Sequence, residues 1–233
     1  MQNYCKTIGA LAAASALVAG NANAEIEYEL HTGYSSMYLF RGADLGDNLV
    51  EVGLDAAYTV DKFTLSGGVW ATAFESSANT GNQVDNEIDW YAEAAYDFGF
   101  MTASVGYIYY WNAGALGEDA GEVPISISRD FGWANIYLTY FWSVDGPNNN
   151  GYMELGGSHS WELSPCLALN YSTNIGFQVE EGDFTAWNNK LSLDWGFAEN
   201  AKVSPFIAYS LDCTQVNGID DEFLGGSMLS VSF

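Results

Sequence analysis

Residues 86–98 read NEIDWYAEAAYDF, and apolar and polar side chains alternate along them almost without interruption. The even positions from Ile88 to Phe98 are apolar, while the odd positions carry the acids Glu87, Asp89, Glu93 and Asp97. A period of two predicts a β-strand with one apolar face and one acidic face. Few soluble strands are this long, but a tilted strand that crosses a membrane needs about 9–11 residues or more.

The same alternation recurs along the chain and predicts twelve strands. Their expected ranges are 26–40, 49–58, 63–74, 86–98, 101–111, 122–130, 134–142, 151–161, 167–179, 186–196, 203–212 and 223–233. Short connections alternate with longer polar ones, as in outer-membrane barrels with short periplasmic turns and long external loops. We therefore expect an all-β fold, a 12-stranded antiparallel transmembrane β-barrel of the outer-membrane type, formed by residues 25–233.

The first 24 residues have the pattern of a signal peptide. Lys6 supplies a positive charge, residues 8–20 are apolar, and Ala22-Asn23-Ala24 is a small-x-small cleavage site. The alternative is an N-terminal membrane anchor, but a spanning helix needs about 20 apolar residues. We expect export to the outer membrane of a Gram-negative-type bacterium. The last strand alternates and ends at Phe233, a signal of the kind that the barrel-assembly machinery recognises, so that machinery is an expected partner.

Acidic residues dominate the composition, with 30 Asp and Glu against 6 Lys and Arg and a net charge of −24. This balance argues against nucleic-acid binding, which needs basic patches. An aromatic content of 15% argues against disorder. Cys166 is expected in a periplasmic turn and Cys213 near the external rim, too far apart to form a disulfide. With only two histidines in addition, the sequence shows no recognisable metal or cofactor site.

Aromatic residues gather near the predicted strand ends, where amphipathic rings favour the interface between lipid and water. Toward the outer interface we expect Phe40, Phe74, Trp111, Trp142, Phe177 and Trp187. The alternative is a soluble β-barrel or sandwich, which would hide its aromatics inside and face its acids to water. Strand length and the signal peptide favour the membrane barrel, surrounded by outer-membrane lipid and lipopolysaccharide.

Residues 35–42 read SSMYLFRG and are followed by ADLGDNLVEVGLDAAY. Tyr38, Phe40, Arg41 and Gly42 match the Tyr-x-Phe-Arg-Gly end of the opening strand in the TorF-like family of bacterial outer-membrane porins, which the chain resembles. The hairpin expected at 87–111 is of the same style. The resemblance implies an outer-membrane barrel with a channel function.

Arg41 stands where the first strand is expected to meet an acidic rim. It is a rim candidate that would orient solutes or hold the first loop in place. The alternative is a structural ion pair with an inward acid such as Glu51 or Asp55. Gly42 beside it suits a turn conformation that other residues resist.

The polar strand faces supply the candidates for a pore lining. These are Glu51, Asp55, Glu87, Asp89, Glu93, Asp97, Asn170, Asn174, Lys190 and Asp194. Rings of Asp and Glu favour cations, so we expect passive diffusion of small polar solutes with cations preferred. Alternatively, the acids keep the lumen wet and the loops soluble, or bind divalent ions that bridge lipopolysaccharide. Tyr91, Tyr110, Tyr137 and Phe206 are expected to narrow a barrel whose strand number lies between filled and open barrels.

Two other functions remain: a non-conducting structural or envelope-interaction barrel, and an outer-membrane lipid hydrolase. A lipid hydrolase of the barrel type would need His-x-Ser on one strand face, so that His activates Ser. His31 is followed by Thr32 and Gly33, and His159 by Ser160 and Trp161. Neither histidine meets this requirement, so we expect no catalytic residue.

Overall fold

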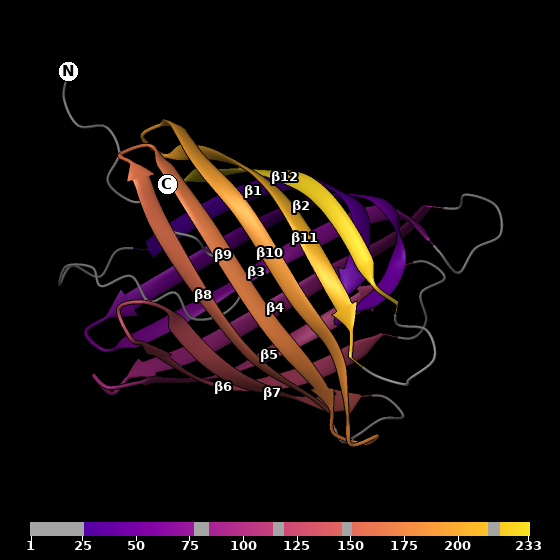
Figure 1. Ribbon diagram of the computed structural model, residues 1–233. Helices are drawn as coiled ribbons and strands as arrows, with labels where there is room; N and C mark the ends of the chain where they lie inside the picture. Colours follow the sequence, from indigo (N-terminus) through magenta and orange to yellow (C-terminus); the bar gives the residue numbers. More distant parts are fainter. Residues whose placement is uncertain (1–25, 77–83, 114–118, 146–150, 214–219) are drawn as a thin grey trace.

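The computed structural model describes residues 26–76, 84–113, 119–145, 151–213 and 220–233, and the signal peptide expected at 1–24 lies outside them. These residues form one closed antiparallel barrel, in which each strand pairs with its neighbours in sequence and the first strand pairs with the last (Figure 1). The strands are β1 (Ile26–Phe40), β2 (Ala43–Val60), β3 (Phe63–Ser76), β4 (Val84–Asp97), β5 (Thr102–Asn112), β6 (Ala120–Asp130), β7 (Asn135–Asp145), β8 (Tyr152–Ser164), β9 (Leu167–Gln178), β10 (Asp183–Ala198), β11 (Ala201–Asp212) and β12 (Glu222–Ser232).

The twelve strands and their antiparallel closure confirm the fold expected from the alternation. The clearest difference is β2, which begins at Ala43 instead of residue 49. Arg41 and Gly42 form a two-residue turn in which both have positive φ, 53° and 90°, as type I′ hairpin turns require. The polar residues after the turn suggested a loop, but they pair with the end of β1.

The outer face of the barrel is apolar, as a lipid environment requires. Large side chains there are about half exposed, for example Val52 at 47%, Ile125 at 48% and Leu155 at 51%. Closure of the sheet removes its edges, so that backbone groups at membrane depth find partners within the wall. The apolar stripe of each strand therefore faces outward and the polar stripe faces the lumen. Among the described residues, no helix has the length and hydropathy to span a membrane.

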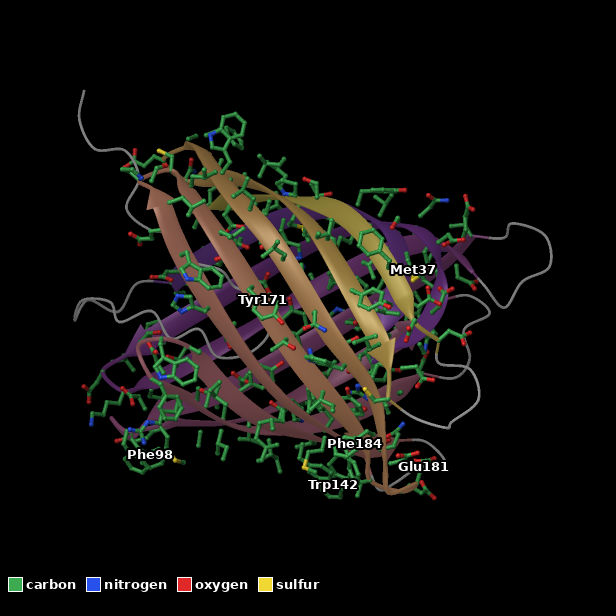
Figure 2. All side chains as sticks on the ribbon, in the orientation of Figure 1. Met37, Phe98, Trp142, Tyr171, Glu181 and Phe184 are labelled. Carbon is green, nitrogen blue, oxygen red and sulfur yellow. The ribbon has the colours of Figure 1, made fainter. Side chains whose placement is uncertain are left out.

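Aromatic side chains gather at both ends of the barrel. We call the end with the short β2–β3, β4–β5, β6–β7, β8–β9 and β10–β11 connections the turn end, and the opposite end the loop end. Figure 2 shows Phe98 near the turn end and Trp142 and Phe184 near the loop end. At the turn end, the Phe98 ring contacts that of Tyr96 at 4.8 Å between centroids. These positions match the two belts expected at the membrane interfaces.

Phe40 and Phe74 do not belong to the outer belt, which corrects the expectation for both. Phe74 is 1% exposed and packs inside the barrel, with its ring centroid 4.9 Å from that of Tyr38. Phe40 packs against the same cluster. Alternation along β3 puts Phe74 on the same side as Thr72 and Trp70, so the error lay in assigning every terminal aromatic to lipid.

Cys166 lies in the β8–β9 turn, and Cys213 directly follows β11 at the loop end; both are free. Their placement at opposite ends confirms that they are too far apart to form a disulfide.

Candidate functional site: the polar lumen

The pore-lining candidates fall on two parts of the inner wall. Six acids come from β2 and β4, and the other four residues come from β9 and β10. We call Glu51, Asp55, Glu87, Asp89 and Glu93 the acid wall. Asp97 lies at the end of β4, where its Oδ1 accepts a hydrogen bond of 2.6 Å from the Gly99 amide, so it holds the β4–β5 turn.

Neutral donors hold most of the acid wall. The Trp70 indole donates to Glu51 at 2.6 Å, and the Tyr38 hydroxyl donates to Glu87 at 2.9 Å. The Tyr91 hydroxyl donates to Asp55. Such donors satisfy carboxylate oxygens and carry no formal charge of their own, so they add no positive charge to the wall.

Ion pairs lie nearer the turn end of the lumen. His31 Nδ1 is 3.2 Å from Asp55 Oδ2, and Lys202 Nζ is 3.8 Å from Asp194 Oδ2. Neither His31 nor Lys202 was among the pore-lining candidates. Lys202 was missed because β11 was expected to begin at residue 203, whereas it begins at Ala201.

Arg41 reaches across the loop end of the lumen to Glu122 on β6. Its Nη1 and Nη2 atoms donate to the two carboxylate oxygens of Glu122 at 2.8 and 2.7 Å. The guanidinium also stacks on the rings of Phe40, Phe141 and Tyr152, 4.7, 4.6 and 4.3 Å from their centroids. We call Arg41, Glu122, Phe141 and Tyr152 the mouth clamp. Arg41 is thus an ion-paired residue, but its partner is Glu122 instead of Glu51 or Asp55.

The environment of Arg41 keeps it charged. Burial lowers the pKa of Arg41, but the hydrogen bonds and the negative charge of Glu122 outweigh that effect and hold the pKa above its ordinary value. The Tyr110 hydroxyl donates to the same carboxylate at 2.9 Å. The Glu122 carboxylate therefore accepts three hydrogen bonds. Because two of them come from a charged guanidinium, the contact is strong and fixed in direction.

Irregularities in the ladders allow the β1–β2 hairpin to bend toward the lumen. The β1–β2 register shifts at Tyr38/Leu39, and the β2–β3 register shifts between Asp47 and Val50. Bulges bend a strand and increase its twist. Beneath the hairpin lies an apolar cluster of Tyr38, Leu49 and Phe74, packed against Phe40, Leu45 and Trp70. The hairpin can be followed at the right of Figure 1, and its Arg41 crosses the mouth to Glu122 on β6.

The wall formed by β9 and β10 is mostly neutral. Asn188 Nδ2 donates to Asn174 Oδ1 at 2.8 Å, and Asn170 Nδ2 donates to Ser192 Oγ at 3.5 Å. Lys190 is exposed to the lumen, and its ammonium lies 4.2 Å from the ring centroid of Phe206. This wall offers amides, hydroxyls and one open cation to a solute.

Inward glycines give the aromatic side chains room to lie along the wall. A Cβ at Gly156 would come within 2.4 Å of the Tyr137 ring, which covers it from the facing position on β7. Gly226 lies beneath Phe206 in the same way. A side chain at either glycine would push a ring toward the lumen axis.

The two histidines lie on different faces of the wall. His31 points into the lumen toward Asp55, whereas His159 packs edge-on against Trp161 at 4.6 Å on the outer face. Across the described ranges, no group of three or more His, Cys, Asp or Glu side chains is arranged to hold a metal ion.

Solved barrels share this architecture. A KdgM porin has a TM-score of 0.57 at 10% identity, with 89% of this chain and 99% of that chain covered. An outer membrane channel from Pseudomonas putida F1 has a TM-score of 0.56 at 11% identity, with 90% and 96% covered. The outer membrane phospholipase A from Escherichia coli has a TM-score of 0.50 at 12% identity, with 89% and 92% covered.

At such identities the likeness shows the fold. Together with the apolar outer face and the aromatic belts, it places the barrel in the outer membrane of a Gram-negative-type bacterium. No curated protein sequence matches the chain.

A family described as "Bacterial protein of unknown function (Gcw_chp)" matches residues 19–213. The match includes β1 through β11 and with them the acid wall, the mouth clamp and Lys190. The chain belongs to this Gcw_chp family.

Proposed function

We propose that the barrel is a porin-like channel for the passive diffusion of small polar solutes, with cations preferred. The observation that carries the proposal is the acid wall, whose carboxylates are held mostly by neutral donors within the lumen of a closed barrel. Carboxylates that line a pore attract cations and repel anions. Of the inward cations among the described residues, Arg41 and Lys202 are already paired with carboxylates.

The comparisons support passage through such a barrel. The similar structures include porins described as KdgM and NanC and an outer membrane channel. One KdgM structure is described as a complex with disordered oligogalacturonate. The Tyr-x-Phe-Arg-Gly resemblance to TorF-like porins favours the same function.

A non-conducting structural or envelope-interaction barrel is the second candidate, and the mouth clamp is the observation that favours it. Arg41 and the apolar cluster beneath the hairpin take up part of the lumen at the loop end. The similarity to phospholipase A adds a lipid hydrolase as a third possibility, but neither histidine has a serine two residues later.

Single-channel recording in a planar bilayer tests the proposal. Refolded barrel under a tenfold KCl gradient is expected to conduct, with a reversal potential displaced toward the potassium equilibrium potential. A displacement toward the chloride potential would overturn the cation preference. Folded protein without conductance would favour the non-conducting barrel, and lipase assays on the same sample would then test the hydrolase.

A further inference from the structure

We infer that Lys190 makes the lumen amphoteric and that the channel favours small zwitterionic solutes, whose carboxylate meets Lys190 while their ammonium group meets the acid wall. This inference deepens the proposed function and rests on it. It concerns the class of solute, whereas net cation preference concerns simple ions.

The first step is that Lys190 differs from the other inward cations. Arg41 is bound to Glu122, and Lys202 lies 3.8 Å from Asp194. Within the described residues, Lys190 has no carboxylate within 4.0 Å; its ammonium contacts the face of Phe206 and is exposed to the lumen. An aromatic face attracts an ammonium group but does not cancel its charge, so Lys190 can still bind an anion.

The second step is the position of the negatively charged side chains relative to Lys190. Two carboxylates, Glu51 on β2 and Asp194 on its own strand, lie close enough to interact electrostatically with Lys190. Three strands, β1, β12 and β11, separate β2 from β10 around the barrel, so Glu51 faces Lys190 across the lumen. Trp70 fixes Glu51 through a hydrogen bond of 2.6 Å. A solute passing between them meets a positive group on one side and a negative group on the other.

The third step is the surroundings of Lys190. Ser172 faces it in the β9–β10 ladder, and Ala208 faces it in the β10–β11 ladder. The next inward residues on its own strand are Asn188 and Ser192. This surface adds hydroxyl and amide groups without a negative charge directly beside Lys190, so a solute carboxylate is not repelled at close range.

Charge complementarity then separates the solute classes. A simple anion meets Lys190 but is repelled by the acid wall. A simple cation meets the acid wall but gains nothing from Lys190. A zwitterion has no net charge, so the negative lumen does not exclude it, and both of its charged groups find a partner.

Swelling of proteoliposomes in glycine or in glycolamide tests this inference. The two molecules are isomers, but only glycine is a zwitterion. Wild-type barrel is expected to admit glycine faster than glycolamide. Lys190→Gln is expected to lower the ratio of glycine to glycolamide rates about two- to fivefold, the range of an ion pair in contact with water. Lys190→Arg is expected to keep most of that ratio.

Glycolamide flux also reports whether each variant is folded and open. An unchanged ratio in Lys190→Gln with normal glycolamide flux would overturn the inference, as would equal glycine and glycolamide rates in wild type. Lys202→Gln is the matched control, since its charge is already paired with Asp194; a larger effect there than at Lys190 would also contradict the assignment. No glycolamide flux in wild type would instead refute the channel itself.

Discussion

The guanidinium of Arg41 and the carboxylate of Glu122 meet in two hydrogen bonds of 2.8 and 2.7 Å, although 81 positions separate them in the chain. This contact joins the tip of the β1–β2 hairpin to β6. Paired hydrogen bonds between Arg and a carboxylate fix orientation as well as distance. The width of the mouth therefore depends on a contact that a single substitution can remove.

Glu122→Gln is expected to release the hairpin and raise single-channel conductance. A hydrogen bond to a charged group contributes about 1.5–3 kcal/mol. If the clamped state of the hairpin loses ~1.4 kcal/mol, the ratio of released to clamped barrels rises roughly tenfold. Arg129→Gln is a suitable control, because Arg129 lies at the other end of β6 against the Phe131 ring. Equal conductance in wild type and Glu122→Gln would show that the clamp does not limit flow.

Neutralising the acid wall is expected to weaken cation preference. The double variant Asp89→Asn, Glu93→Gln keeps side-chain size while replacing two lumenal carboxyl groups with neutral amides, so its reversal potential should move toward zero. The effect should shrink at about 1 M salt, where the screening length is roughly 3 Å. Asp61→Asn, in the β2–β3 turn, removes a charge outside the lumen and tolerates the positive φ of 54° there. A comparable shift in this control would point to surface charge instead of lumenal charge.

Gly156→Ala is expected to lower conductance and thermal stability, because the new Cβ would lie 2.4 Å from the Tyr137 ring and displace it into the lumen. Overpacking of this kind typically costs about 1–3 kcal/mol. At Gly225, whose nearest neighbour would be 3.6 Å from a new Cβ, the same change should have little effect. Adding Tyr137→Ala to Gly156→Ala should restore conductance, and failure to do so would argue against displacement of the ring.

The two cysteines report the orientation of the barrel in the membrane. Cys213 lies at the loop end and is exposed, whereas Cys166 lies in a turn at the opposite end. A membrane-impermeant maleimide added to intact cells is expected to label wild type and Cys166→Ala, but not Cys213→Ala. Labelling of Cys213→Ala in intact cells would mean that the turn end, with Cys166, faces the outside of the cell.

The strand number and the direction of side chains in the regular parts of the strands could be predicted because a period of two assigns alternate residues to opposite faces. Asp89 and Trp90 follow that rule without any knowledge of their neighbours. The partner of Arg41 could not be predicted in this way, since it depends on bulges that bend one hairpin toward another part of the wall. Phe74 was misplaced for another reason: its position near a strand end suggested lipid, whereas alternation along β3 puts it inside, where it packs with Tyr38 and Leu49.

Pairing of β1 with β12 extends to backbone hydrogen bonds between Tyr28 and Phe233 in both directions, at 3.4 and 2.9 Å. This seam joins the first strand of the barrel with the last. Until β12 is present, a partial sheet has two edges with unpaired backbone N–H and C=O groups. Exposing such groups to the hydrocarbon core of a membrane is energetically costly. The sheet can therefore close only when the residues of β12 are present, so the complete barrel cannot form strand by strand from β1 alone.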